Sequence, residues 1–168
     1  MQKVNRLRDK WRNVVFFLPA LLVVAADQLS KTWIRSNLAV GQSLFELGFF
    51  RITLVPPNTG AAFGLFQGHS FALTIIGLSG VVVLLAYAFF FYRYFPLLDN
   101  RLSNLALGLI LGGALGNLID RLNPNLGGVT DFISIGIWPA FNIADSAVVV
   151  GTIIFAYILL RLARAEKR

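Results

Sequence analysis

The sequence contains no cysteine and a single histidine among its 168 residues. The absence of cysteine excludes disulfides, thiolate metal sites and a cysteine nucleophile. A site built from several histidines is also excluded, and a Ser-His-Asp triad would have to use His69. We therefore predict neither a metal nor a cofactor. The catalytic chemistry that remains open to this chain is that of carboxylates.

Charged residues are scarce as well, at 14% of the chain, whereas hydrophobic residues reach 57% and mean hydropathy is +0.71. Soluble domains usually contain about 45–50% apolar residues, so this composition predicts an integral membrane protein. The length fits one domain, and we expect residues 1–168 to form a single membrane domain.

Four long apolar runs divide the chain, and about 20 apolar residues are enough for a helix to cross a bilayer. They predict an all-α membrane protein with four transmembrane helices, at about 14–34, 71–92, 102–120 and 140–160. The two outer loops, 35–70 and 121–139, contain a small β element. Within them Leu44–Val55 predicts two short strands on the membrane surface, and Val129–Ile135 predicts a further strand that carries Asp131.

The net charge of +7 is concentrated beside the apolar runs. Eleven of the fifteen lysines and arginines lie in residues 1–12, at Arg93 and Arg101, and in residues 161–168. Such an excess of positive charge marks cytoplasmic segments. We therefore expect both termini in the cytoplasm and no nucleic-acid partner, with membrane lipid surrounding the helices.

Three glycines recur at four-residue spacing on the third apolar run, at Gly108, Gly112 and Gly116. Small residues at this spacing allow helix backbones to approach one another closely. We interpret the glycines as packing positions of the third helix and assign them no chemistry.

Asp27, Asp120 and Asp145 lie in or beside the apolar runs. An ionisable side chain at the centre of a membrane helix costs roughly 2.5 kcal/mol or more and is a functional-site hypothesis by default. With a rise of about 1.5 Å per residue, all three carboxylates come to ~20–27 Å above the inner helix ends. They share one layer just below the outer membrane surface, together with polar residues that fall in or beside that layer, namely Asn58, Asn117, Arg121 and Asn142.

The acidic residues differ in their neighbours along the chain. Asp27 precedes Lys31 by four residues and can pair with it on one helix face, and Asp120 is followed by Arg121 at a helix end, so a structural role stays open for both. Asp131 and Asp145 have no basic residue within nine positions. Two such carboxylates predict an aspartyl dyad that shares one proton. The ionised member takes a proton from water, and the protonated member donates to the scissile carbonyl and later to the leaving amine.

Three other functions compete with this interpretation. A proton-coupled transporter or channel would use the intramembrane carboxylates as a relay, but a relay should spread them across the membrane and here they crowd one side. An assembly subunit would use the glycine face and would leave Asp131 and Asp145 unexplained. Another class of intramembrane aspartyl protease would place its carboxylates deeper within the spans.

Five motifs then resemble, in order, those of the bacterial lipoprotein signal peptidase family, signal peptidase II. They are ADQLSK (Ala26–Lys31), NTGAAF (Asn58–Phe63), GGALGNLIDR (Gly112–Arg121), VTDF (Val129–Phe132) and FNIADS (Phe141–Ser146). The resemblance implies a membrane aspartyl endopeptidase of the bacterial inner membrane, with its active site near the outer face. Its partner would be a lipidated prolipoprotein, cut just before the diacylglyceryl-modified cysteine. We expect the enzyme to be a monomer.

The resemblance also implies roles for individual residues. Asp131 of VTDF and Asp145 of FNIADS match the catalytic pair. Other motif positions match residues that the family uses around the substrate and this pair, namely Asn58, Gly60, Asn117, Arg121 and Asn142. Asp27, Lys31 and Asp120 match a supporting polar shell.

Overall fold

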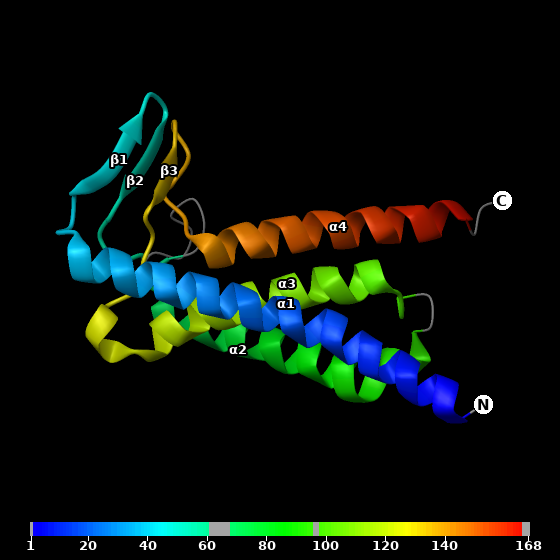
Figure 1. The fold of residues 1–168 in the computed structure, drawn as a ribbon. Coiled ribbons are helices and arrows are strands. Elements are labelled where there is room, and N and C mark those ends of the chain that lie inside the picture. The colour runs from blue at the N-terminus through cyan, green and yellow to red at the C-terminus, as the bar shows by residue number, and fades with distance from the viewer. Residues whose placement is uncertain (1, 61–67, 96–97, 166–168) are drawn as a thin grey trace.

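The computed structural model describes residues 2–60, 68–95 and 98–165, in which four long helices run alongside one another (Figure 1). Each is long and apolar enough to cross a membrane, which confirms the predicted helical membrane fold. Both termini lie at one end of the bundle, and a small sheet lies at the other. The helices are α1 (Gln2–Asn37), α2 (Ser70–Ala86), α3 (Arg101–Leu122) and α4 (Ile143–Ala165).

The α3 helix packs against each of the other three, and α1 also contacts α4. Its glycines make this close approach possible, as the sequence predicts. A Cβ atom at Gly112 would lie 2.7 Å from the carbonyl oxygen of Ala20 on α1, and one at Gly108 would overlap the carbonyl of Phe16. Gly113, which lies outside the predicted glycine series, allows α4 to approach in the same way, because a Cβ there would overlap the carbonyl of Ala144.

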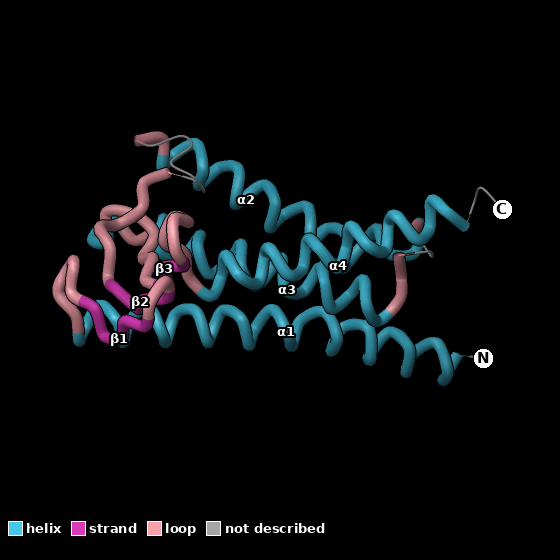
Figure 2. Tube along the Cα trace, turned by 90° about the horizontal axis from the view of Figure 1, so that it is seen from above, coloured by secondary structure: helices cyan, strands magenta, loops and turns pink. Residues whose placement is uncertain are grey.

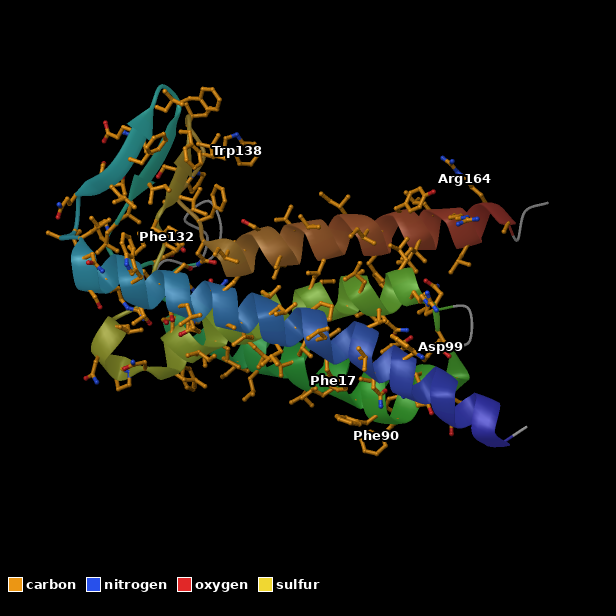
Figure 3. All side chains as sticks on the ribbon, viewed as in Figure 1. Phe17, Phe90, Asp99, Phe132, Trp138 and Arg164 are labelled. Atoms are coloured by element: carbon orange, nitrogen blue, oxygen red, sulfur yellow. The ribbon has the colours of Figure 1, made fainter. Side chains whose placement is uncertain are left out.

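Apolar packing fills the half of the bundle near the termini. Phe16, Val81, Leu107 and Leu111 are buried in one hydrophobic cluster that joins α1, α2 and α3. Phe90 is 70% exposed and points away from the bundle (Figure 3). A side chain of this kind is expected to face lipid, because the bilayer solvates it.

The sheet contains three antiparallel strands in the order β1 (Ser43–Leu47), β2 (Phe50–Thr53) and β3 (Ile133–Ile135). The first two confirm the pair of strands predicted in the first outer loop. In Figure 2 the sheet lies over the end of α1. A second hydrophobic cluster joins the two through Ile34, Leu38, Leu54 and Phe132.

The third strand is shorter than the predicted Val129–Ile135, and Asp131 precedes it instead of lying within it. The backbone is divided between different partners here. Val129 forms an isolated bridge with Asn58, whereas Ile133 pairs with β2 and with Phe141. Between these pairings, the carbonyl of Asp131 accepts a hydrogen bond from the Val55 amide at 3.3 Å. The backbone of Asp131 is therefore fixed from both sides.

Candidate functional site

Asn142, the residue before α4, contacts both Asp131 and Asp145. Its side-chain Nδ2 donates to Asp131 Oδ1 at 2.7 Å. Its backbone amide donates to Asp145 Oδ2 at 3.2 Å, and the Asp145 amide donates back to Asn142 Oδ1 at 2.9 Å. This reciprocal pair is a capping box, which begins the helix and satisfies its first free amides. Both carboxylates therefore bind to Asn142, the residue that caps the N-terminus of α4.

A second amide holds each carboxylate from the other side. Asn58 Nδ2 donates to Asp131 Oδ2 at 2.9 Å, and Asn117 Nδ2, on α3, donates to Asp145 Oδ1 at 2.7 Å. Among the described residues, neither carboxylate lies within ion-pair distance of a lysine or arginine. The amides thus orient both groups without neutralising their charge.

Lys31 occupies the centre of a buried network beside this pair. Its Nζ lies 2.8 Å from Asp27 Oδ2 and 3.4 Å from Asp120 Oδ2, and it donates to Asn117 Oδ1 at 3.0 Å. These contacts use all three ammonium hydrogens. The side chains of Asp27, Lys31 and Asp120 are 0% exposed. The predicted pairing of Asp27 with Lys31 is confirmed.

Asp120 does not pair with Arg121, which corrects one alternative raised by the sequence. Its Oδ2 faces Lys31, lies 3.8 Å from Arg35 Nη1, and accepts from the Thr130 amide at 2.9 Å. Consecutive residues on a helix point in different directions and do not face each other. Arg121 instead donates from Nη2 to the carbonyl of Gly60 at 3.2 Å.

Asp27 also joins the first helix to the last. Its Oδ1 accepts from the Ala144 amide in the first turn of α4 at 3.0 Å. Gly116 makes room for this contact, because a Cβ there would lie 2.7 Å from Asp27 Oδ2. A carboxylate at a helix N-terminus is stabilised by the helix dipole. Asp27 therefore fixes the turn that carries Asp145.

The structure brings together all the site residues predicted from the sequence and adds three more, Gln28, Arg35 and Thr130. Gln28 Nε2 donates to Asp120 Oδ1 at 3.1 Å, and Arg35 Nη1 donates to Thr130 Oγ1 at 2.8 Å. The four-residue spacing of Asp27, Lys31 and Arg35 on one face of α1 is a signal that could have identified Arg35. The last three residues of the NTGAAF motif, Ala61–Phe63, lie outside the described residues.

The environment of Asp131 changes its acidity. Burial, followed by the negative charge of Asp145, raises the pKa of Asp131 to about 6 from 3.8, against the lowering effect of its amide donors. Close carboxylates in a buried site cannot both ionise easily. Within the described residues, no group of three or more His, Cys, Asp or Glu side chains is arranged to hold a metal ion. The site can therefore offer a protonated and an ionised carboxyl side by side.

We expect wild type to lose stability relative to Asp131→Asn as pH rises from about 4 to about 6. The folded protein keeps a proton that the unfolded chain releases above pH 3.8, so this contribution is fully present below 3.8 and is lost as pH passes about 6. The shift of about two units corresponds to ~3 kcal/mol at most. Melting temperatures of both proteins in detergent, measured across this range, test it. A difference that stays constant with pH would contradict the assignment.

The fold and site define a class: a polytopic membrane protein with two amide-held carboxylates at one end of its bundle, as an aspartic peptidase of the membrane requires. The family model described as "Signal peptidase (SPase) II" matches residues 19–161. The chain belongs to the signal peptidase II family and is an aspartic peptidase. This confirms the family and the type of enzyme that the motifs indicate.

Relatives and solved structures agree with this assignment. A lipoprotein signal peptidase from Dehalococcoides mccartyi is 51% identical over 142 residues, which covers 84% of this chain and 86% of that protein. One from Moorella thermoacetica is 47% identical over 154 residues, covering 91% and 97%. A structure described as a bacterial membrane enzyme, solved by the in meso method at 2.3 Å resolution, has a TM-score of 0.75 at 33% identity and covers 86% of each chain.

Proposed function

We propose that Asp131 and Asp145 are the catalytic pair of this peptidase. The observation that carries the proposal is the position of Asn142, which donates to both carboxylates from one residue. One ionised and one protonated carboxyl can activate water and polarise a peptide carbonyl. The raised pKa of Asp131, about 6, supports a proton held on the pair up to about pH 6, well above the range of an ordinary aspartate.

The substrate that fits is a prolipoprotein whose signal peptide is removed just before a diacylglyceryl-modified cysteine. The relatives are named lipoprotein signal peptidases, and the family acts on lipidated precursors in membranes. Acyl chains need the bilayer while the peptide emerges from it, so such a cysteine lies at a membrane interface. The polar end of the bundle, beneath the sheet, suits that position.

Other polar residues serve the substrate and the pair. Asn58, Asn117 and Asn142 orient the carboxylates, and Gly60 supplies the carbonyl that Arg121 binds. Within the described part of the chain, the buried Nε of Arg121 has no hydrogen-bond partner. A donor in this state is available to a substrate carbonyl. Asp27, Lys31 and Asp120 support this layer from below.

All these residues come from one chain, and we propose that the enzyme acts as a monomer. The cleavage rate in detergent should then rise linearly with enzyme concentration, and the purified protein should have the molar mass of one chain by light scattering. A rate that rises faster than the enzyme concentration would require a second copy.

The decisive experiment compares two precursors, one with the diacylglyceryl group and one without it. Purified protein in detergent should cleave the modified precursor and leave the other intact, as read by mass spectrometry of the products. Cleavage before the cysteine in both precursors would contradict the requirement for lipid. Absence of cleavage in either would contradict the function.

We further propose that both termini are cytoplasmic and that the carboxylate pair lies near the outer face. In Figure 3, Arg164 and Asp99 lie at the end of the bundle opposite Trp138 and the sheet. The basic residues beside the spans favour the cytoplasm for that end.

Cysteine labelling tests this orientation, and the chain has no native cysteine to remove. Asn125→Cys in the outer loop should react with an impermeant maleimide added to intact cells, and Arg164→Cys should react only after lysis. Both side chains are exposed. Gly127 is unsuitable because its φ of 68° strains any other residue. The reverse labelling pattern would overturn the orientation.

A further inference from the structure

We propose that Asp145 is the ionised member of the pair and the base that activates water, and that Asp131 carries the shared proton. Asn117, oriented by Lys31, is the positioning residue that keeps Asp145 ionised and the proton on Asp131. The inference rests on the proposed function of the pair. It assigns different chemistry to two carboxylates that the sequence leaves equivalent.

The carboxamide of Asn117 has one allowed orientation. Its oxygen accepts from Lys31 Nζ at 3.0 Å and from Asn142 Nδ2 at 3.1 Å. A flipped carboxamide would turn its own NH2 group toward an ammonium and an amide donor, which offer it no acceptor. Asn117 Nδ2 therefore faces Asp145 Oδ1, at 2.7 Å. A fixed donor at this distance favours the charged form of a carboxylate.

The start of α4 favours the same state. Asp145 lies in the first turn, where its Oδ2 accepts from the Asn142 amide and the helix dipole attracts negative charge. Asp27 holds the adjacent Ala144 amide and keeps this turn in place. Both oxygens of Asp145 thus accept hydrogen bonds in a site that suits an anion.

Asp131 lacks this support, because it lies on an extended segment before β3 and not at a helix end. It is 2% exposed, and among the described residues its carboxylate accepts hydrogen bonds from two neutral side-chain amides, those of Asn58 and Asn142. The Asn142 donor is shared, since Nδ2 also lies 3.1 Å from Asn117 Oδ1 and 3.3 Å from the Thr130 carbonyl. Burial and the charge of Asp145 raise the pKa of Asp131 to about 6.

The formal charges around the pair are also consistent with one proton on it. Lys31 and Arg35 offset the two supporting carboxylates, and Arg121 interacts electrostatically with the catalytic pair. One proton on the pair therefore makes the whole layer neutral. The groups that face one another here are the carboxylates Asp27, Asp120, Asp131 and Asp145 and the cations Lys31, Arg35 and Arg121.

The assignment gives a balanced reaction. The Asp145 carboxylate takes a proton from water as the water oxygen bonds to the scissile carbon, and Asp131 gives its proton to the carbonyl oxygen. In the resulting tetrahedral diol, Asp145 holds the proton taken from water and gives it to the amide nitrogen as the C–N bond breaks. The donor to the leaving amine is therefore the other carboxyl from the one that the sequence interpretation gave this step. Asp131 takes a proton back from a diol hydroxyl as the new carboxylic acid forms. Both residues return to their starting states.

Infrared spectroscopy can locate the shared proton, because a protonated carboxyl has a C=O stretch distinct from that of a carboxylate. Wild type, Asp131→Asn and Asp145→Asn should be compared in detergent about one pH unit below the Asp131 pKa of about 6, where roughly nine in ten of these groups are protonated. Carboxyl-13C aspartate identifies the band by its isotope shift. We expect the band in wild type and in Asp145→Asn, and its loss in Asp131→Asn.

A band that survives in Asp131→Asn and vanishes in Asp145→Asn would overturn the inference. The proposed function would still stand if both variants had lost cleavage, so the two failures are distinguishable. Cleavage by either variant would refute the catalytic pair itself, and with it this inference.

The role of Asn117 has a separate readout. Asn117→Asp keeps the acceptor for Lys31 but replaces the donor to Asp145 with a negative charge, which favours protonation of Asp145. The acidic limb of the kcat profile should move upward by about one pH unit, with a fall in kcat on the order of 100-fold and a nearly unchanged KM. Asn104→Asp, the same substitution at a buried position near the other end of α3, should leave the profile in place. An unshifted profile in Asn117→Asp would contradict the positioning role.

Discussion

Asp131→Asn and Asp145→Asn should each reduce cleavage of lipidated precursor by a factor on the order of 10³ or more, because neither variant can exchange a proton with water or substrate at the substituted position. Near pH 7, above the range in which the Asp131 proton contributes to stability, their melting temperatures should stay within about 4 °C of wild type, equivalent to ~1 kcal/mol. Removing a buried charge favours Asp145→Asn, since Asp145 is the proposed ionised member of the pair. The introduced asparagine also has a cost, because it turns an NH2 group toward an amide donor that now binds a carboxylate oxygen. This unpaired contact lowers the stability of each variant.

The two measurements should be made on the same preparations. Asp99→Asn is the matched control, because Asp99 lies at the opposite end of the bundle (Figure 3) and its substitution should leave cleavage unchanged. If Asp145→Asn still cleaves, or if it loses its activity only by unfolding, the pair is a structural network and not a catalytic dyad.

Lys31→Met should cause the largest loss of stability. Methionine has similar length, but it leaves Asp27 and Asp120 buried without the ammonium that now lies 2.8 Å and 3.4 Å from them. Removing one partner of a buried ion pair typically costs about 3–5 kcal/mol. For a chain of this size that corresponds to a fall in melting temperature of roughly 10 °C, measurable in detergent. Arg164→Met at an exposed position is the control.

A triple variant separates charge from packing. In Lys31→Met with Asp27→Asn and Asp120→Asn, no fully buried charge is left unpaired. Arg35 loses the Asp120 carboxylate at 3.8 Å, but its side chain is 25% exposed, so solvent compensates. The amide oxygen introduced at position 27 can still accept from the Ala144 amide. Most of the lost stability should return, since buried ionic groups can be replaced by neutral ones at little net cost. If the triple variant melts as low as Lys31→Met alone, the loss comes from packing and the ion-pair account is incorrect.

Much of the fold follows from the sequence, because one-dimensional patterns specify it. Apolar length locates the four helices, and glycine spacing identifies the α3 face that meets α1. The length of β3 could not be predicted. The run from Val129 has strand-forming residues throughout. Its hydrogen bonds are divided between Asn58, which is remote in sequence, and Phe141, which returns to it after a turn.

Which residues lie in the candidate site could be predicted from the sequence, whereas the contacts between them could be predicted only in part. Depth along each helix places Asp27, Asp120 and Asp145 in one layer, and the pair Asp27–Lys31 follows from four-residue spacing. The partner of Asp120 depends on how α1 packs on α3, which no local pattern records. Adjacency to Arg121 was a misleading signal, because the helix turns that side chain toward Gly60.

The contact between Asp27 and the Ala144 amide has a consequence for biosynthesis. Helix α1 is synthesised before α4, and its Asp27 completes the first turn of α4. Until α4 has been inserted, Asp27 lacks this partner and Asp145 is absent from the membrane. If Asp145 belongs to the catalytic pair as proposed, the chain gains proteolytic activity only after α4 has been inserted.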